Sequence, residues 1–525
     1  MFPCRGAWGC SATSACFFID ETRCHMDVWL SAFQTVFSPT TLFFIAGGVM
    51  LGTVLGAIPG LNSTMGTALL IPFTFAMSSE NGLALLAAVY CGGTFGGSIS
   101  AILFNVPGAP EAAATGFDGY PMAQRGQAGE ALGYAIMSSV IGGLFSVFVM
   151  NMVSPQLAKV GLTFSQPEYF ALAVAALSLI SSLGGAGMAK AFIAGLVGLL
   201  MATVGLDEMT ALERFTFGGK ALIGGINFIP AIIGAFAVGE ILAKAEEGKG
   251  LSGEHLELKV STKLPRLKEM LRLKWTVIRS ALIGTAIGIL PGVGATTAAF
   301  VGYSEAVRWS KHPEKFGTGV PEGIAGPETA NNAATGGAMV PLLTLGIPGS
   351  ATTAVIIGGF LVHGLQPGPM LFINQPKLMY SIFLAMYVAN IMMLFAGLGV
   401  AKVFANFRRV RYSILGPIIF VFAAIGSFGV RNDIIDVWIM FGFGLLGYLF
   451  KKFKYPIAPM IIGLVLGPLT EVSLRKGLDM MDFSLSAFLF RPIAAPILLI
   501  AVGSVLWNLY SVLIKKGKAS MEEIE

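Results

Sequence analysis

Charged residues are scarce in this sequence. Asp, Glu, Lys and Arg make up 12% of the 525 residues, whereas 55% are hydrophobic. A soluble globular domain carries about 25% charged residues, so this composition excludes that class. Apolar runs recur along the whole chain; most are long enough to cross about 30 Å of hydrocarbon, and several are short or broken. They lie at 41–60, 82–104, 130–153, 165–183, 188–205, 221–243, 275–301, 349–365, 378–404, 412–430, 433–450, 455–468 and 488–514. The sequence predicts an all-α polytopic membrane protein with about ten to twelve transmembrane helices.

The common signatures of catalysis are missing. The chain has no GxxxxGK[ST], HExxH or GxSxG motif, which excludes P-loop nucleotide hydrolysis and the commonest hydrolases. Its four histidines (His25, His255, His312 and His363) are scattered. We therefore expect no enzyme and no cofactor.

Cysteine is almost confined to the N-terminus. Four of the five cysteines lie in the first 24 residues, at spacings that match no zinc site. Residues 1–25 also lack the apolar core of a signal peptide, whereas Met26 begins an amphipathic segment. We expect translation to start at Met26, which makes residues 1–25 a doubtful extension.

Basic residues cluster in four places, at 244–274, 408–411, 451–454 and 515–518. The positive-inside rule places all four in the cytoplasm, with the N-terminus outside and the C-terminus inside. The polar stretch 245–273 is then a cytoplasmic linker. It separates a first transmembrane repeat at 26–244 from a second repeat and C-terminal helices at 274–525.

The two halves share two motifs in the same order. GTVLGAIPG (52–60) aligns with GTAIGILPG (284–292), and GGSISAILFNVPG (96–108) aligns with GAMVPLLTLGIPG (337–349). Since the loop charges place the starts of the two halves on opposite sides, they favour inverted repeats, with parallel repeats as the alternative. Inverted repeats whose helices are broken or re-entrant at glycine and proline are typical of secondary transporters.

Each Pro-Gly break predicts a ligand site. A half-helix that begins after the break presents N–H groups and a positive dipole end that attract anions, while carbonyl groups that end the preceding half-helix suit Na⁺. Small-residue helix packing is the alternative explanation for any single glycine. The candidate substrate- or cation-binding residues are Pro59, Gly60, Asn62, Ser63, Thr64, Asn105, Pro107, Gly108, Pro291, Gly292, Gly294, Thr296, Thr297, Glu328, Asn331, Asn332, Pro348, Gly349, Ser350, Thr352 and Thr353.

Basic side chains are absent around these motifs. No Lys, Arg or His occurs between His25 and Arg125 or between Arg279 and Arg308. Between Lys315 and Lys377 there is only His363. An anion bound there must be balanced by backbone N–H groups, hydroxyls and bound cations, which predicts cation-coupled anion transport.

Acidic residues flank the motifs at Glu111, Asp118, Glu305, Glu322 and Glu328. A carboxylate at membrane depth is a functional candidate. We expect most of these acids in solvated loops, Asp118 among them, and take Glu328 as the functional candidate.

The motifs resemble those of the tripartite tricarboxylate transporter TctA family, the large membrane subunit of these systems. The resemblance rests on LGAIPGLNSTMGTALLIPFTF, GILPGVGATTAAFVGYSEA and PEGIAGPETANNAATGGAMVPLLTLGIPGSATTAVIIGGF, and it covers nearly the whole chain from Met26. Asn62 departs from the glycine expected in the first motif. The resemblance implies a multi-pass protein of the bacterial inner membrane with two partners, a small membrane subunit of about four helices and a periplasmic solute-binding protein that delivers the substrate. It also implies uptake of a di- or tricarboxylate such as citrate, driven by Na⁺ or H⁺.

Two other functions compete with a coupled carrier. A passive anion channel, or a permease scaffold energised by a partner, would not by itself concentrate substrate against its gradient. An intramembrane enzyme is less favoured, because no paired catalytic residues occur at membrane depth.

Overall fold

The computed structural model describes residues 26–182, 188–207, 209–247, 264–406, 412–506 and 510. The doubtful extension at 1–25 lies outside the described residues, as do most of the linker and the basic clusters at 408–411 and 515–518. The start at Met26 and the division into 26–244, 245–273 and 274–525 therefore stay predictions.

The first half is helical apart from one short hairpin of strands. After a helix at residues 26–36, its elements are α2 (Pro39–Ala57), α3 (Ser63–Thr74), α4 (Ser79–Phe104), η1 (Pro110–Ala112), α5 (Ala113–Met122), η2 (Ala123–Gln127), α6 (Ala128–Gly161), α7 (Gln166–Ser182), α8 (Met188–Ala202), β1 (Gly205–Leu206), β2 (Glu213–Arg214), η4 (Lys220–Leu222), α9 (Phe228–Ile233), η5 (Gly234–Val238) and α10 (Gly239–Glu247). The two strands are antiparallel, with Gly205 opposite Arg214 and Leu206 opposite Glu213.

The second half follows a similar plan. Its elements are α11 (Leu267–Arg272), α12 (Lys274–Ile289), α13 (Gly294–Trp309), η6 (Pro313–Lys315), α14 (Pro321–Leu345), α15 (Ala351–Val362), α16 (Pro369–Asn374), α17 (Pro376–Asn406), α18 (Tyr412–Arg431), α19 (Ile434–Lys452), α20 (Ile457–Asp479) and α21 (Leu485–Leu489). A further apolar helix covers Ala494–Leu506.

The prediction of an all-α polytopic membrane protein is confirmed. Within the described residues, seven helices are long and apolar enough to cross a membrane, and four shorter apolar helices accompany them. Two predicted spans need correction. The run 275–301 is divided between α12 and α13 by the Pro-Gly break, and 349–365 holds only the 12-residue α15. At 1.5 Å per residue, α15 extends about 18 Å and is too short to cross the hydrocarbon core.

Helices α2 and α4 run parallel in close contact. A Cβ atom on Gly52 would lie 2.5 Å from the Val89 carbonyl oxygen, and one on Gly56 would lie 2.3 Å from the Gly93 carbonyl oxygen. The contact advances by four residues on both helices, which fixes the parallel direction. Only glycine allows the two backbones to approach so closely.

Helix α3 then turns back along α4. Ser63, at its start, lies beside Gly93, whereas Thr74, at its end, lies beside Gly82. Helices α2 and α3 therefore form a helical hairpin whose tip is the Pro59-Gly60 break.

The second half repeats this hairpin. Gly284 and Gly288 of α12 lie against the carbonyl oxygens of Ala330 and Ala334 of α14, at 2.2 and 2.5 Å from the would-be Cβ atoms. Helix α13 returns along α14, because Gly302 again contacts Ala330. Helices α12 and α13 form a second hairpin with Pro291-Gly292 at its tip.

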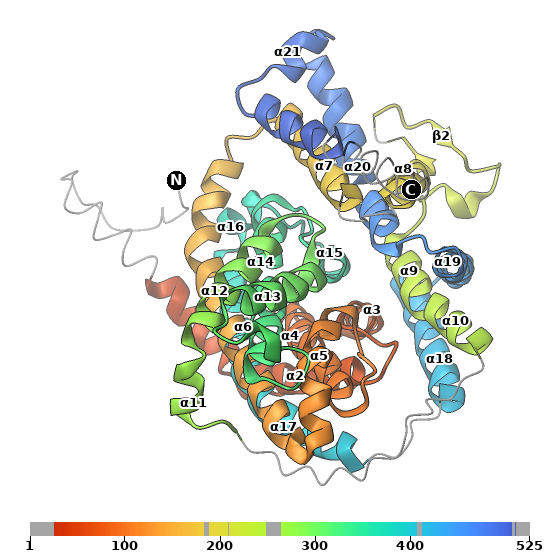
Figure 1. Cartoon of the computed structure of the whole chain (residues 1–525). Helices are drawn as coiled ribbons and strands as arrows, with labels where there is room; N and C mark the ends of the chain where they lie inside the picture. Colours follow the sequence, from red (N-terminus) through yellow and green to blue (C-terminus); the bar gives the residue numbers. More distant parts are fainter. Residues whose placement is uncertain are drawn as a thin grey trace, which may run out of the picture.

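The two hairpin units run in opposite directions. The Ser98 hydroxyl of α4 contacts Glu328 of α14, and Cys91 contacts Thr335, so α4 and α14 are antiparallel. Each is backed by a helix from the other half, α14 by α6 and α4 by α17. Figure 1 shows this central bundle, with α7–α10 and α18–α21 forming an arc beside it.

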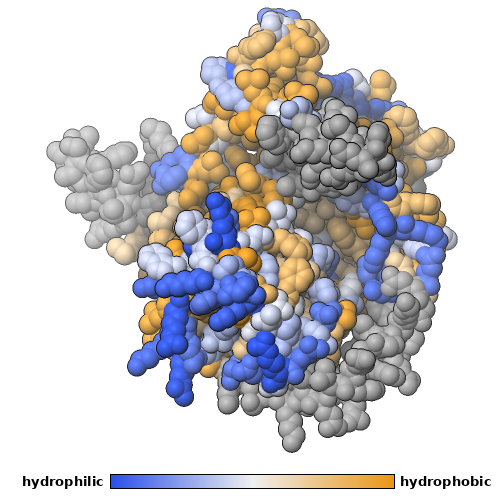
Figure 2. Space-filling model, in the orientation of Figure 1, coloured by the Kyte–Doolittle hydropathy of each residue, from blue (hydrophilic) through white to orange (hydrophobic). Residues whose placement is uncertain are grey.

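The outer surface is strongly apolar over much of one face. Figure 2 shows hydrophobic residues gathered over its upper part and hydrophilic residues toward the lower left. Large side chains such as Phe43, Phe395 and Leu499 are about seven-tenths exposed (72%, 69% and 72%). In a soluble protein such a surface would aggregate, whereas a bilayer covers it.

Candidate functional site

The two broken segments of each half bind each other. The Gly60 N–H donates to the Gly108 carbonyl oxygen at 3.4 Å, and the Gly292 N–H donates to the Gly349 carbonyl oxygen at 2.9 Å. Gly60 and Gly292 have φ values of 92° and 79°, which residues with a side chain rarely adopt. Equivalent positions in the two halves thus make the same contact, as expected for structural repeats.

New helices begin after the breaks, as predicted, but their first turns differ. Asn62 caps α3, its side-chain oxygen accepting from the Met65 N–H at 2.9 Å. Ser350 caps α15 through the Thr353 N–H at 3.2 Å. No side chain caps α13 or η1. Asn62 therefore serves as a helix cap.

The starts of these helices converge between the two halves. The hydroxyls of Thr64 and Thr352 lie 2.8 Å apart, and that of Ser63 lies 3.3 Å from Thr352. The Tyr90 hydroxyl is 3.2 Å from the Ser350 hydroxyl. Helix α13 packs against η1. Helix starts from both halves thus gather around one buried polar centre.

Glu328 lies in that centre with no exposed surface. Its carboxylate accepts hydrogen bonds from Ser98 at 2.5 Å, Thr115 at 2.5 Å and Ser139 at 2.7 Å. The Asn331 amide approaches it at 3.4 Å. These hydroxyls come from α4, α5 and α6, so three helices of the first half enclose a carboxylate of the second.

A second carboxylate, Glu111, lies close to the first. It is 8% exposed, interacts electrostatically with Glu328 and bonds to Ser63. The Asn331 side chain donates to the Glu111 carbonyl oxygen at 3.3 Å. Within the described part of the chain, no lysine or arginine contributes to these contacts of Glu328 and Glu111. Two buried carboxylates without a basic partner cost several kcal/mol unless a proton or a cation balances them.

Sequence reasoning missed much of this cage. Ser98, Thr115, Ser139 and Tyr90 were not candidates, and Glu111 was noted only as a flanking acid. The usable signal was a hydroxyl on an otherwise apolar, glycine-rich helix, as in Ser98 of GGSIS, but such hydroxyls more often bond to their own helix backbone.

Several candidate residues lie away from the centre or support it indirectly. Asn105 and Pro107 are exposed, and Asn105 ends α4 in a left-handed conformation (φ 54°). Thr296 and Thr297 are half-buried in the first turn of α13. Asn332 donates to the Asn331 side-chain oxygen at 2.7 Å and so orients its neighbour.

The expectation of a solvated Asp118 is wrong. Asp118 lies in α5 with no exposed surface. One carboxylate oxygen accepts from the N–H groups of Gly319 and Val320, at 2.8 and 2.9 Å, and the other accepts from the Tyr303 hydroxyl at 3.0 Å. A segment distant in sequence folds over FDGYP, so Asp118 joins the start of α14 to α5.

We predict that Asp118→Ala destabilises the protein strongly. The change leaves the buried N–H group of Gly319 and the half-buried N–H group of Val320 without their acceptor, and an unpaired buried N–H group costs about 1–3 kcal/mol. Tyr303→Phe removes a single hydroxyl and should cost about 1 kcal/mol. Thermal unfolding in detergent measures both, and equal midpoints for the two variants would contradict the assigned role of Asp118.

The absence of basic side chains around the breaks also needs correction. It holds along the sequence but not in space, because α10 brings Lys244 against the tip of the α2–α3 hairpin. A Cβ atom on Gly60 would lie 2.9 Å from the Lys244 Cε and 3.7 Å from its Nζ.

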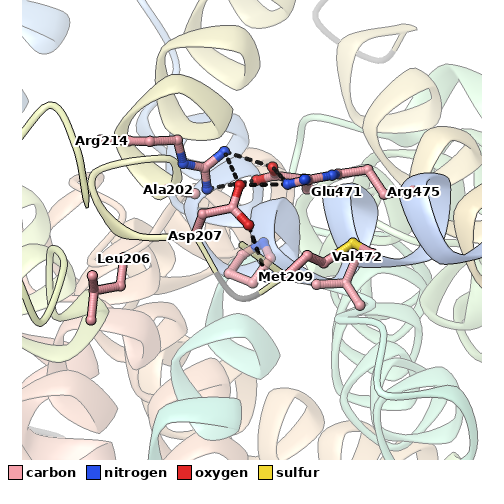
Figure 3. A pocket seen from close by; sticks show the side chains of 9 residues that line it. Ala202, Leu206, Asp207, Met209, Arg214, Glu471, Val472 and Arg475 are labelled. Atoms are coloured by element: carbon pink, nitrogen blue, oxygen red, sulfur yellow. Dashed lines mark hydrogen bonds and ion pairs between the residues drawn. The ribbon is translucent and has the colours of Figure 1, made fainter. Parts of the chain in front are cut away.

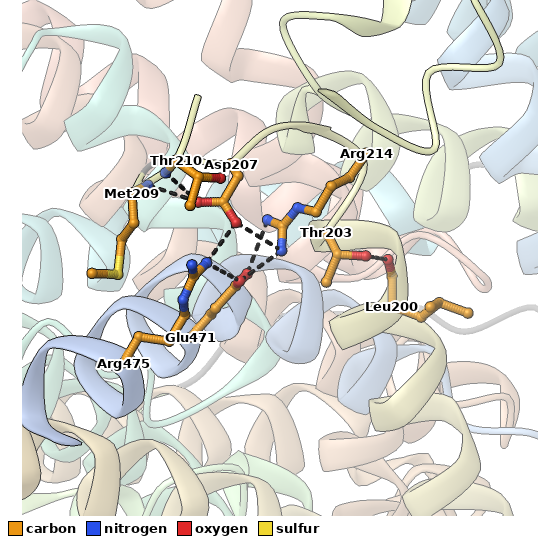
Figure 4. Close-up of polar contacts among 8 residues, drawn as sticks. All are labelled: Leu200, Thr203, Asp207, Met209, Thr210, Arg214, Glu471 and Arg475. Carbon is orange, nitrogen blue, oxygen red and sulfur yellow. Dashed lines mark hydrogen bonds and ion pairs between the residues drawn. The ribbon is translucent and has the colours of Figure 1, made fainter. Parts of the chain in front are cut away.

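A second polar cluster lies where β1–β2 meets the end of α20. Arg214 forms a bidentate pair with Glu471, at 2.6 and 3.1 Å, and Arg475 bonds to Asp207 at 2.5 Å (Figure 4). Hydrogen bonds from the Thr210 N–H and from Arg475 hold the pKa of Asp207 well below its usual range. The pocket in Figure 3 is lined by these mutually paired charges. The cluster anchors the strand hairpin to α20.

The fold and the buried centre define a multi-pass helical membrane protein with two hairpin units around a shared polar site. The chain belongs to the tripartite tricarboxylate transporter TctA family, whose family model matches residues 42–462. The protein is therefore a component of a tripartite transporter.

Two similar proteins come from Agrobacterium vitis. One, described as an uncharacterized 52.8 kDa protein in the TAR-I ttuC' 3'region, is 40% identical over 447 residues, covering 85% of this chain and 88% of that protein. The other, an uncharacterized protein in the TAR-II ttuC' 3'region, is 39% identical over 195 residues, covering 37% of this chain and 81% of that protein. No solved structure matches the chain.

Proposed function

We propose that this protein carries out secondary active uptake of a di- or tricarboxylate such as citrate, coupled to Na⁺ or H⁺. The observation that carries the proposal is the Glu111–Glu328 pair, buried in a cage of hydroxyls beside converging helix starts. The pair needs positive charge, and the helix starts favour negative charge. A cation or proton and an anion therefore have adjacent, complementary places.

In this proposal the substrate anion and the coupling cation or proton bind at separate, adjacent places, as in a symporter. The substrate carboxylates lie against the first turns of α3, α13 and α15, where N–H groups have no partner within the helix. The coupling cation or proton occupies the carboxylate cage, whose oxygen atoms suit Na⁺ as well as a proton. Each side stabilises the other electrostatically, which is the coupling that transport requires.

The driving force follows from the charges moved. Each net positive charge carried inward gains about 2.3 kcal/mol per 100 mV of membrane potential. Uptake is electrogenic when more cations than substrate charges enter together.

The proposed orientation follows the basic clusters. The end of the bundle that carries Lys268, Lys274 and Lys451 faces the cytoplasm, as in a bacterial inner-membrane protein. The α2–α3 hairpin then enters from the periplasm and the α12–α13 hairpin from the cytoplasm, which makes the repeats inverted. A periplasmic solute-binding protein delivers the substrate, and a small membrane subunit of about four helices completes the system.

Uptake of labelled citrate into proteoliposomes tests the proposal. The vesicles hold this protein and its small partner, with the binding protein outside and an inward Na⁺ or H⁺ gradient switched on or off. We expect accumulation above the external concentration only when a cation gradient and the binding protein are both present. Citrate that merely equilibrates under every gradient would favour the passive channel.

A further inference from the structure

The tip of the α2–α3 hairpin touches two charged side chains of α10. A Cβ atom on Gly60 would lie 2.9 Å from the Glu240 Oε1 atom and 2.9 Å from the Lys244 Cε atom. Gly60 has a φ of 92°, so conformation and space both require glycine there. The absence of a side chain at the tip lets the carboxylate and the ammonium group reach its backbone.

Glu240 and Lys244 reach the tip together because they are four residues apart on one face of α10. The π-helical turn η5 directly precedes α10, and such turns often occur at functional sites. The other carboxylate oxygen of Glu240, Oε2, pairs with Lys451 of α19 at 2.7 Å. The ion pair with α19 thus uses one carboxylate oxygen of Glu240, and the other, Oε1, lies at the tip.

We infer that Lys244 binds a carboxylate group of the transported anion at this tip, and that Glu240 competes with the anion for the same place. The inference rests on the proposed function and adds a residue that no motif indicated. The Glu240 Oε1 atom stands beside the Gly60 backbone, where an incoming carboxylate would meet the Lys244 ammonium and the start of α3. An internal carboxylate at that position occupies the site when no substrate is present and leaves it when substrate arrives.

Two charge-neutralising changes should act in opposite directions. Lys244→Gln removes a charge-assisted hydrogen bond to the substrate, so we expect the Kd for citrate to rise about tenfold or more. Lys244→Arg keeps the charge and should stay within about threefold of the original protein. Glu240→Gln removes the competing carboxylate, and the Kd should fall. A purely structural role for the pair would weaken binding in both cases.

Equilibrium binding of labelled citrate to the purified complex of this protein and its small partner measures these effects. Lys454→Gln is the matched control, an exposed lysine in the turn between α19 and α20. If the Lys244→Gln variant does not assemble, the Glu240→Gln variant still tests the inference. An unchanged or higher Kd of the Glu240→Gln variant for citrate would overturn it. Two results together would contradict this inference but not the proposed function. The unmodified complex accumulates citrate in proteoliposomes, and the Lys244→Gln variant binds citrate with the same Kd as the Lys454→Gln variant. An unmodified complex that never accumulates citrate contradicts the proposed function itself.

Discussion

Glu328→Gln should abolish gradient-driven accumulation while leaving citrate exchange across the membrane. Glutamine keeps the size of the side chain and one carbonyl acceptor for the hydroxyls of Ser98 and Thr115. It removes the charge that a coupling cation or proton must balance. The expected result is a loss of about 100-fold or more in accumulation, since a coupling energy of about 3 kcal/mol corresponds to that factor. Exchange needs no net cation movement and should stay within about tenfold.

Glu322→Gln is the matched control for this change. Glu322 lies in the first turn of the same helix α14, but it is only half-buried, so its neutralisation should leave accumulation intact. Both variants are assayed in the same vesicles for uphill uptake and for exchange of internal for external citrate. If Glu328→Gln still concentrates citrate under a cation gradient, the coupling site lies elsewhere.

Gly52→Ala and Gly284→Ala should destabilise the protein by similar amounts. The two glycines occupy equivalent places in α2 and α12, and an added methyl would lie 2.5 and 2.2 Å from the carbonyl oxygens of Val89 and Ala330. Backbone atoms cannot move aside cheaply, so each change should cost about 1–3 kcal/mol or more.

Gly47→Ala provides the contrast within α2. Nothing lies within 4 Å of a Cβ atom at Gly47, and alanine favours helix over glycine by about 1 kcal/mol. We expect an unchanged or higher unfolding midpoint for Gly47→Ala and lower midpoints for the other two. A midpoint for Gly52→Ala equal to that of Gly47→Ala would contradict the close contact between α2 and α4.

The sequence predicted the positions of the helix breaks well. Pro-Gly pairs inside apolar runs can only break a helix, and the two matching pairs of motifs placed the breaks at 59–60, 107–108, 291–292 and 348–349. The Gly60–Gly108 hydrogen bond and the Gly292–Gly349 hydrogen bond join positions that the aligned motifs make equivalent. Composition alone was sufficient for the membrane class.

What the sequence did not predict depends on contacts between distant segments. Asp118 is buried because the chain at Gly319 and Val320 folds over it. Lys244 reaches Gly60 because α10 packs beside the first hairpin. Ser139 donates a hydrogen bond to Glu328 because α6 lies along α14, a helix of the other half. No local pattern encodes which of many buried hydroxyls face a carboxylate.

The concentration ratio at which net citrate flux vanishes tests the central claim most directly. Proteoliposomes containing the complete complex are held at a fixed cation gradient and membrane potential, and the internal citrate concentration is varied until labelled citrate shows no net movement. A coupled carrier reaches this point at a citrate ratio displaced from the electrochemical equilibrium of citrate itself, and the ratio shifts when the cation gradient is changed. Zero net flux at the equilibrium of citrate, whatever the cation gradient, would contradict coupling and identify a passive pathway.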